Sequence, residues 1–321
     1  MSRAVETLAR IPLATLTIMA LCFIVYGYQL LVDPPLEHYT MCPRRIIYLH
    51  QWYRVITSTM FHTSLMHIAM NMMSTMAIGS SLERQIGTIM MALTIFFGIL
   101  LTGAIYISIS WLLFAVFGLE KMMLQHAAGF SGVIFQLSVL ESNLSPNRTR
   151  SVFGVFTVSS RMYPWALLVA IQLVMPHISF LGHLSGILIG SLQYHGALNV
   201  LFPREEYLQE CETSERLSVL RAQPSYVPTP ESTGLRGENG GGLQSAVLVG
   251  CGAVVQSVKN LCEAVRVIVF GRGAEMNSNI QLGVPWDVDA AAGLNDSLPL
   301  IEEDEEWAGL PEIIQRSTEE R

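Results

Sequence analysis

Charged residues are scarce in this chain, and their scarcity excludes an ordinary soluble protein. Only 14% of the 321 residues are charged, whereas 51% are hydrophobic and the mean hydropathy is +0.41. A soluble globular domain carries about 25% charged residues. The composition therefore predicts a protein that lies largely within a membrane.

The few charges are divided unequally along the chain. Residues 1–204 carry 11 basic and 6 acidic residues, whereas residues 205–321 carry 8 basic and 20 acidic residues. The acidic excess of the second part argues against nucleic acid as a partner. We expect a membrane half and an acidic tail, joined near Pro203.

Aspartate is missing from the whole region between Asp33 and Asp287. An aspartyl intramembrane protease needs two membrane aspartates, so that class is excluded, and a Ser-His-Asp triad lacks its acid. The sequence also contains no HExxH, no CxxC and no Cys/His metal spacing among its five cysteines. It therefore implies no metal site, no cofactor and no disulfide framework.

Six apolar segments predict six membrane spans. They cover residues 11–32, 60–82, 89–113, 127–140, 163–175 and 179–201. A bilayer core needs about 20 residues of helix, so the fourth and fifth segments are too short to cross it. Their ends must stop inside the bilayer, shielded by other helices or facing water. Arg3 and Arg10 favour a cytosolic N-terminus.

A serine and a histidine, each flanked by glycines, interrupt the apolar character of two of these spans. Ser131 lies in the run GFSG at 129–132, and His183 lies in GHLSG at 182–186. A polar or ionisable group in lipid is costly and marks a functional site. We interpret Ser131 as a nucleophile and His183 as its base, at the bottom of a notch open to water.

Small residues recur around both groups and allow two helices to pack closely. They are Gly129 and Gly132 in the fourth span and Gly182, Gly186 and Gly190 in the sixth. Close packing of these spans would bring the serine within reach of the histidine.

The second span carries its own polar groups, His62, His67 and Asn71. His67 and Asn71 are four residues apart and share one helical face. At the end of this span, Glu83 and Arg84 are expected to form a solvated pair.

Each of these residues also has a purely structural reading. A lone membrane serine usually bonds back to its own helix, and a His/Asn pair can join two helices by hydrogen bonds. Interhelical bonding does not require a serine, a histidine and a His/Asn pair on three separate spans, so the combination favours the catalytic reading.

The three motifs GFSG, GHLSG and HTSLMHIAMN (62–71) resemble the signature motifs of the rhomboid intramembrane serine proteases, in the same order. The stretches 52–54 and 82–84 fit the family as well, and the resemblance covers roughly residues 11–202. The residues around the motifs are most similar to those of the endoplasmic-reticulum branch of the family, whose members carry a cytosolic tail. The fold expected is an all-α polytopic membrane protein, a six-transmembrane-helix rhomboid bundle with a largely disordered C-terminal tail.

The resemblance implies a role for each polar residue. Ser131 would attack the peptide carbonyl, and His183 would take its proton and return it to the leaving amine. The backbone N–H of Ser131 and the side chains of His67 and Asn71 would stabilise the oxyanion. The supporting residues implied are His62 and Arg54.

The sequence predicts three parts: a cytosolic head (1–10), the rhomboid protease domain (11–202) and an acidic, mostly disordered cytosolic tail (203–321). Residues 244–270 are expected to form an amphipathic helix on the membrane surface. Residues 302–320 resemble a ubiquitin-interacting helix apart from Pro311 and Ile313, so ubiquitin or quality-control factors are candidate partners. An ordinary acidic tail is the competing interpretation.

The leading functional hypothesis is an intramembrane serine protease that cleaves transmembrane protein substrates, in contact with membrane lipid. The competing hypothesis is a non-catalytic rhomboid-like protein that binds misfolded membrane clients and helps to extract them. Such pseudoproteases lack the serine or the histidine, whereas this chain keeps both. The resemblance implies the endoplasmic reticulum, with the Golgi or another endomembrane as alternatives.

Overall fold

The computed structural model describes residues 10–145, 149–176 and 178–235, together with residues 252, 256 and 260. These residues all belong to one compact unit, residues 1–273. Most of the predicted head and tail lies outside the described residues. The same holds for the ubiquitin-interacting-like segment and, apart from three single positions, for the expected helix at 244–270.

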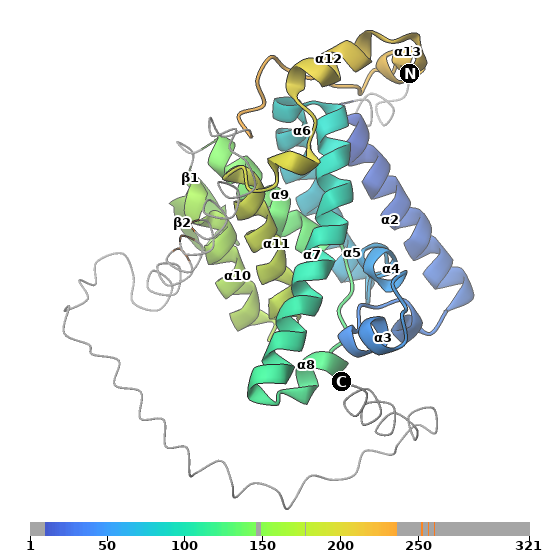
Figure 1. The fold of residues 1–321 in the computed structure, drawn as a ribbon, viewed down its shortest axis with the longest axis vertical. Coiled ribbons are helices and arrows are strands. Elements are labelled where there is room, and N and C mark those ends of the chain that lie inside the picture. Colours follow the sequence, from blue (N-terminus) through green and yellow to red (C-terminus); the bar gives the residue numbers. More distant parts are fainter. Residues whose placement is uncertain are drawn as a thin grey trace, which may run out of the picture. The chain divides into compact units, whose positions relative to one another are not determined.

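Helices form most of the described chain (Figure 1). The first half contains α2 (Leu13–Val32), η1 (Leu36–His38), α3 (Pro43–Tyr48), α4 (Arg54–Met60), α5 (Leu65–Ser74), the π-helix η2 (Thr75–Gly79), α6 (Ser80–Ile86) and α7 (Thr88–Phe117). The second half contains α8 (Glu120–Leu124), α9 (Ser131–Leu144), β1 (Thr149–Val152), β2 (Phe156–Ser159), η3 (Ser160–Met162), α10 (Tyr163–Val174), α11 (Phe180–Tyr194), η4 (Asn199–Leu201), α12 (Glu205–Thr213), η5 (Glu215–Leu217) and α13 (Ser218–Arg221).

Two helices, α2 and α7, are long and apolar enough to cross a membrane by length and composition. They coincide with the predicted first and third spans. The predicted second span begins later than expected, because the chain breaks after α4 and resumes at Leu65 to run through α5, η2 and α6. The predicted fourth, fifth and sixth spans correspond to α9, α10 and α11. These have only 14, 12 and 15 residues, or roughly 20 Å of helix each.

The segment expected to be a loop between the fourth and fifth spans contains an antiparallel hairpin of β1 and β2, with Thr149 opposite Ser159. Arg150 of this hairpin forms an ion pair with the buried Glu141 of α9. Glu141 also accepts a hydrogen bond from Ser81 (2.8 Å). The hairpin therefore fixes the start of α10 to the end of α9, a contact that the sequence did not indicate.

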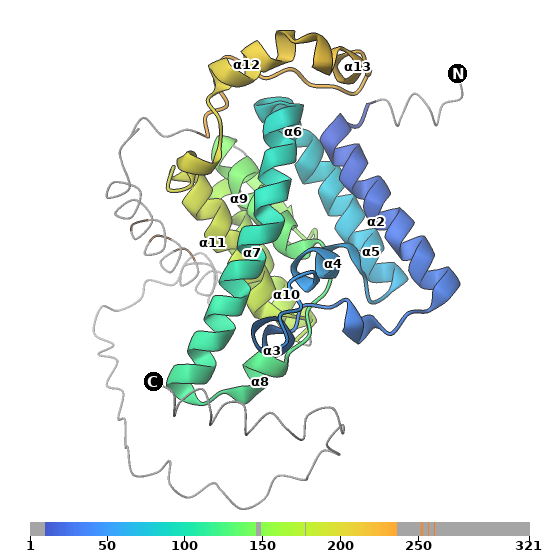
Figure 2. The same ribbon diagram turned by 45° about the vertical axis from the view of Figure 1, so that its right-hand side comes forward.

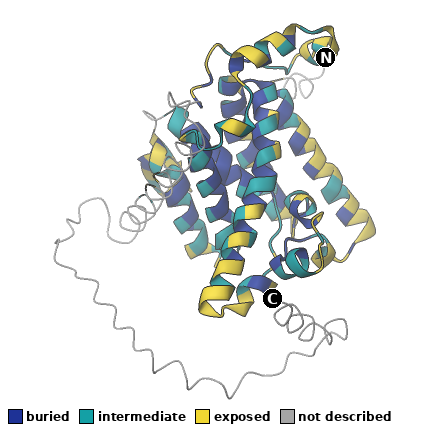
Figure 3. Cartoon of the chain, viewed as in Figure 1, coloured by how far each residue is buried: buried dark blue, intermediate teal, exposed yellow. Residues whose placement is uncertain are grey.

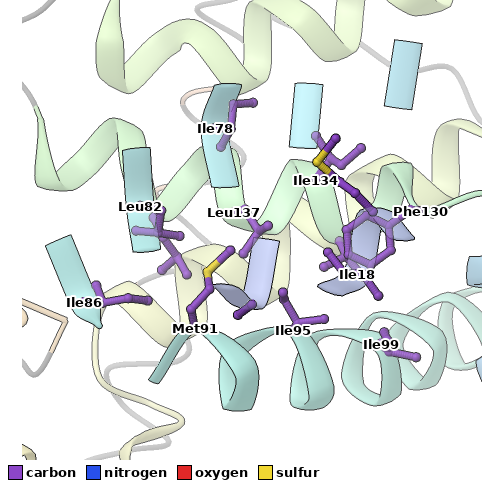
Figure 4. Packing of buried hydrophobic residues seen from close by; sticks show 14 of the residues in the cluster. Ile18, Ile78, Leu82, Ile86, Met91, Ile95, Ile99, Phe130, Ile134 and Leu137 are labelled. Atoms are coloured by element: carbon purple, nitrogen blue, oxygen red, sulfur yellow. The ribbon is translucent and has the colours of Figure 1, made fainter. Parts of the chain in front are cut away.

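Helix α9 lies at the centre of the bundle, where Figure 3 shows mostly buried residues. All ten residues from Val133 to Ser142 are buried. Side chains of α6, α7 and α9 interlock around Leu82, Met91 and Leu137 (Figure 4). The outer faces of α2 and of the last turns of α7 expose large apolar side chains instead, as expected for surfaces that meet lipid.

Helices α9 and α11 approach so closely that only glycine fits between them. A Cβ atom on Gly186 would lie 1.9 Å from the carbonyl oxygen of Gly132, and one on Gly190 would lie 2.8 Å from that of Gln136. Gly182 has more room, since a Cβ there would contact only the side chain of Ser179, the capping residue of α11, at 3.4 Å. The predicted small-residue stripe therefore packs against α9 through Gly186 and Gly190.

Glu83 is fully buried and caps the N-terminus of a different helix. Its Oε1 accepts hydrogen bonds from the Ala14 N–H (2.9 Å) and the Thr88 hydroxyl (2.7 Å). Its Oε2 accepts from the N–H and the hydroxyl of Thr15 (2.8 and 2.7 Å). The first N–H groups of a helix lack intrahelical acceptors, and a carboxylate there also interacts favourably with the helix dipole.

The expected solvated pair of Glu83 and Arg84 is therefore wrong. Arg84 points elsewhere and donates to the backbone carbonyls of Ser80 (3.1 Å) and Arg10 (2.5 Å). The carboxylate instead satisfies the free N–H groups at the buried N-terminus of α2, where the helix dipole also favours negative charge.

The chain remains folded well beyond the predicted boundary at Pro203. We call residues 204–235 the clasp; it contains α12, η5 and α13 and lies over the starts of α2 and α7 (Figure 2). The carbonyl of Ser225 accepts from the Leu13 N–H (2.9 Å), and the carbonyl of Val227 accepts from the Thr88 N–H (2.8 Å). The sequence prediction ended the domain too early, because the clasp binds through backbone groups that composition does not reveal.

The clasp has an internal hydrogen-bond network of its own. Glu212 accepts from the Tyr226 hydroxyl (2.6 Å) and from the Thr229 hydroxyl (2.8 Å) and N–H. Burial and this contact with Glu212 raise the pKa of Tyr226. Leu208 and Leu235 of the clasp join the main apolar core, so the clasp belongs to the domain.

Replacing Glu83 by glutamine is expected to destabilise the protein although the side chain keeps its size. Both carboxylate oxygens accept backbone N–H groups, so an amide must turn its NH₂ group toward one of these donors. We expect a loss of about 1–3 kcal/mol of unfolding free energy, seen as a lower thermal midpoint in detergent. Glu120→Gln on exposed α8 is the matched control; an equal midpoint for the two variants would contradict the capping role.

Removing the clasp is expected to lower the thermal midpoint by about 5 °C or more, because two helix N-termini lose acceptors and two core leucines are lost. The measurement compares a chain ending at residue 203 with one ending at residue 240, which keeps the clasp. Equal midpoints for the two truncations would show that residues 204–235 do not stabilise the bundle.

Candidate active site

Ser131 is the first residue of α9 and lines a cavity within the bundle. Gly129, two residues earlier, adopts φ = +106°, which side chains other than glycine rarely tolerate. Its N–H donates to the Ser58 carbonyl (2.7 Å), so the turn before Ser131 is fixed to the end of α4. This turn presents the Ser131 side chain to the cavity.

His183 lies in the first turn of α11, one turn after the capping residue Ser179. Its Nε2 is 2.9 Å from Ser131 Oγ, and the side chain is only 4% exposed. The Phe135 ring packs on the imidazole with centroids 4.5 Å apart. Phe135 is four residues after Ser131 and shares its helical face; this spacing could have identified it from the sequence.

The hydrogen bonds of His67 indicate which ring nitrogen carries the proton. The Thr63 N–H donates to Nδ1 (3.4 Å), and the Thr63 hydroxyl lies 3.1 Å from the same atom. Nδ1 is then an acceptor, which assigns the proton to Nε2. A Cβ on Gly129 would lie 2.7 Å from Nε2, so this donor lies directly beside the turn that precedes Ser131.

Asn71 lies one helical turn after His67 and is 5% exposed. Its Nδ2 donates to the His67 carbonyl (2.9 Å), and its Oδ1 has no partner among the described residues. One N–H of the amide remains, on the same side as Gly129. His67 and Asn71 therefore offer one N–H each at the cavity wall.

A single cavity brings the four residues together. Its wall includes His67, Asn71, Ser131 and His183, and it also includes residues of α7 and α10. The start of α9 faces this cavity. The first helical hydrogen bond of α9 runs from the Ile134 N–H to the Phe130 carbonyl (3.1 Å), so the N–H groups before Ile134 have no acceptor within the helix. The preceding N–H groups and the helix dipole favour negative charge near Ser131.

His62 lies beside the site but not in it. It is 1% exposed, and its ring meets the edge of His67 with centroids 5.1 Å apart. Its backbone N–H and carbonyl both bond the Gln29 side chain of α2 (3.1 and 2.9 Å). His62 and Gln29 thus fix the turn that precedes α5; Gln29 was not singled out by the sequence.

Arg54 is also buried, at 1% exposure, and holds the loop between α2 and α4. Its guanidinium donates to the carbonyls of Glu37 (2.5 Å) and Thr40 (2.9 Å) and to the Gln51 side chain (2.6 Å). Burial lowers the pKa of Arg54, although a guanidinium stays charged at neutral pH. Arg54 does not line the cavity.

A short extended segment just before Ser131, residues 126–128, lines the cavity; we call it the rim segment. Met41 and Ala127 pair as an antiparallel bridge through two backbone hydrogen bonds (2.8 and 3.0 Å). His126 lies next to this bridge, with its Nδ1 2.6 Å from the Thr40 hydroxyl. Burial, followed by the positive charges of Arg45 and Arg54, lowers the pKa of His126, so its ring is neutral at neutral pH.

Among the described residues, no group of three His, Cys, Asp or Glu side chains lies close enough to hold a metal ion. The chemistry available at the cavity is thus a hydroxyl, an imidazole within hydrogen-bond distance, and nearby N–H donors. This set suits attack on a carbonyl with proton transfer through the imidazole.

The chain is similar to several known proteins. Residues 49–196 match the rhomboid domain family. Rhomboid-like protein 15 of Arabidopsis thaliana is 34% identical over 226 residues, covering 68% of this chain and 55% of that protein. Rhomboid-related protein 4 of Mus musculus is 34% identical over 164 residues (51% and 52%), and rhomboid-type serine protease 2 of Gibberella zeae is 27% identical over 236 residues (72% and 84%).

The chain spans about half the length of the first two of these curated relatives. The matched region contains both glycine-flanked motifs, the His67/Asn71 pair and, apart from Met41, the residues that line the cavity. The resemblance read from the motifs is confirmed at this level: the chain carries a rhomboid domain at residues 49–196 and is similar to proteins of the rhomboid family.

Proposed function

We propose that this protein is an intramembrane serine protease in which Ser131 is the nucleophile and His183 the general base. The observation that carries the proposal is the 2.9 Å separation of Ser131 Oγ and His183 Nε2 in a buried, glycine-packed setting. A nucleophile and base within about 2.6–3.2 Å are the signature of covalent catalysis by an activated hydroxyl.

Proton transfer requires His183 Nε2 to be free of its proton before attack, so Nδ1 carries it. Nδ1 has no partner in the described part of the chain, in keeping with a dyad that lacks an orienting acid. Phe135 packing supports the ring orientation in place of such an acid. His183 would then return the proton to the leaving amine.

The oxyanion would form beside the start of α9. The Ser131 N–H, His67 Nε2–H and the remaining Asn71 N–H are the donors we assign to it. Donors that meet charge only as it develops favour the transition state, and losing one typically costs about 10²–10³ in rate. The tautomer that Thr63 imposes on His67 supports this assignment.

The apolar walls of the cavity support the proposal that the substrate is a transmembrane protein. Met66 and Met70 of α5 line one side, and Leu167 and Ile171 of α10 line another. A substrate helix arriving from lipid would meet these apolar walls between α5 and α10. The N–H and C=O groups of a helix are already hydrogen-bonded to one another, so the substrate helix must unwind near the cleaved bond before the site can bind it.

The rim segment supports binding of an unwound strand. In an extended chain, successive residues direct their backbone groups to opposite edges. Ala127 bonds Met41 on one edge, so His126 and Ala128 present theirs on the other, and both line the cavity. A substrate segment would add there as a strand, held by main-chain hydrogen bonds.

We also propose the six-span topology, with α2, the run from α5 to α6, α7, α9, α10 and α11 as spans and the N-terminus in the cytosol. The short α9, α10 and α11 leave room for water above Ser131. We place the protein in the endoplasmic reticulum, with other endomembranes as alternatives. One relative, 30% identical, is named as mitochondrial, so imaging of a tagged chain is the test.

Ser131→Ala and His183→Ala are each expected to abolish cleavage of a transmembrane reporter and labelling by a fluorophosphonate probe. The measurement uses purified full-length protein in liposomes, with thermal unfolding to show that both variants remain folded. Retained cleavage by either folded variant would refute the dyad.

Gly186→Ala is expected to reduce cleavage by at least about 10-fold, because its Cβ would lie 1.9 Å from the Gly132 carbonyl oxygen and must push α11 away from α9. Gly27→Ala on α2, where a Cβ would meet nothing within 4 Å, is the matched control and should cleave normally. Equal activity of the two variants would contradict the role of the close helix contact.

A further inference from the structure

The methionines of α5 gather on one side of the helix, next to the cavity. Residues 65–76 contain five of the 16 methionines of the chain. Met72 is buried in the apolar core, whereas Met66 and Met73 are 68% and 60% exposed. Met66, Met70 and Met73 are spaced by four and three residues and therefore share one side of the helix, which we call the methionine face.

The methionine face is continuous with the cavity that holds the dyad. Met66 and Met70 line this cavity, and so do His67 and Asn71, which follow them in the chain. One helix thus presents N–H donors to the cavity and methionines beside it. A substrate helix lying along the methionine face would have its unwound end within reach of Ser131.

No neighbouring helix occupies this position. Helix α5 packs against α2 and α9, whereas α10 packs against α9 and α11. Both α5 and α10 line the cavity, and the exposed methionines show that the outer side of α5 is left uncovered. A helix that enters between α5 and α10 would meet the methionine face first.

This protein does not use methionine on its other apolar surfaces. The large apolar side chains exposed on α2 and α7 are those of leucine, isoleucine, valine, phenylalanine, tyrosine and tryptophan. Within the described part of the chain, the exposed methionines are Met66, Met73 and Met76, and all of them lie on α5 and η2. Their restriction to the helix beside the cavity favours a protein helix over lipid as the partner of this face.

Methionine suits a surface that must accept partners of different shape. Its side chain is unbranched, with three rotatable bonds and a polarisable sulfur, so it adapts to irregular neighbours. A β-branched side chain on a helix has one strongly preferred χ1 angle and cannot adapt in this way. A face made of methionines therefore contacts helices of differing sequence about equally well.

We propose that the methionine face of α5 is the surface on which the transmembrane helix of a substrate docks, and that it makes the protein tolerant of helices that differ in side-chain shape. This inference rests on the proposed protease function. It adds the part of the protein that holds the uncut portion of the substrate and decides how strictly that portion is selected.

Docking is tested without cleavage, in the full-length Ser131→Ala protein. A photo-reactive benzoylphenylalanine replaces Met73, and the protein is reconstituted in phosphatidylcholine liposomes with a transmembrane reporter. We expect a crosslink between the protein and the reporter. The same group in place of Ile24, which is 67% exposed on α2, is the matched control and should crosslink to lipid only.

Tolerance is tested by combining Met66→Ile, Met70→Ile and Met73→Ile, which keeps the face apolar but makes it stiff. The value of kcat/KM is measured on three reporters that share one cleavage segment and differ in a leucine-, valine- or phenylalanine-rich helix. Each value is divided by the rate of fluorophosphonate labelling of Ser131. We expect the three values to agree within about 3-fold for the unsubstituted protein and to spread by about 10-fold or more in the variant, since a misfit of one methylene costs at least about that factor.

Two further variants accompany this measurement. Met73→Ile alone changes a residue outside the cavity wall and should widen the spread in the same direction, even if the triple variant unfolds. Leu21→Ile combined with Leu30→Ile, on the exposed side of α2, is the matched control and should leave the spread unchanged.

Each part of the inference can fail separately. A crosslink at position 73 to lipid alone would overturn the docking surface, and an equal spread for the unsubstituted protein and the Met73→Ile variant would overturn the tolerance. Cleavage retained by Ser131→Ala would overturn the protease proposal and leave the crosslink result standing. An inactive Ser131→Ala that forms no crosslink at position 73 would overturn the docking surface alone.

Discussion

The backbone contact between α9 and α11 is the constraint on which the rest of the site depends. Gly186 lies against the Gly132 carbonyl with no space for a methyl group. Lipid tails are as apolar as leucine, so helices in a membrane gain little from hydrophobic burial and associate through close packing instead. This contact places the start of one helix beside the first turn of the other, and Ser131 and His183 occupy those two places.

The free N–H groups at helix starts explain why remote segments of the chain contact the N-termini of α2 and α7. The starts of α2 and α7 are satisfied by Glu83 and by carbonyls of the clasp. Unpaired backbone donors cost several kcal/mol in a medium without water, which is why remote parts of the chain are used to cap them. The start of α9 faces the cavity instead, where a developing negative charge could use its donors.

Polar side chains around the cavity are arranged in layers. His67 and Asn71 present N–H groups, and His62 lies behind them with Gln29 holding its backbone to α2. Arg54, which lies outside the cavity, holds the neighbouring loop through direct hydrogen bonds. Buried polar groups are worth their cost only when their partners are well placed. Arg54 and Gln29 therefore contribute to the geometry of a cavity that they do not line.

The sequence by itself determined the membrane character, the family and the positions of the long helices, because scarce charge, apolar runs and short motifs are local signals. It also singled out the serine, the histidine and the His/Asn pair. Only the tertiary structure decided that Glu83 caps α2, that the chain stays folded to residue 235, and that Gln29 fixes the turn before α5. These contacts join residues that are mostly far apart in the chain, and they run through backbone groups and single hydroxyls that leave no periodic pattern in the sequence.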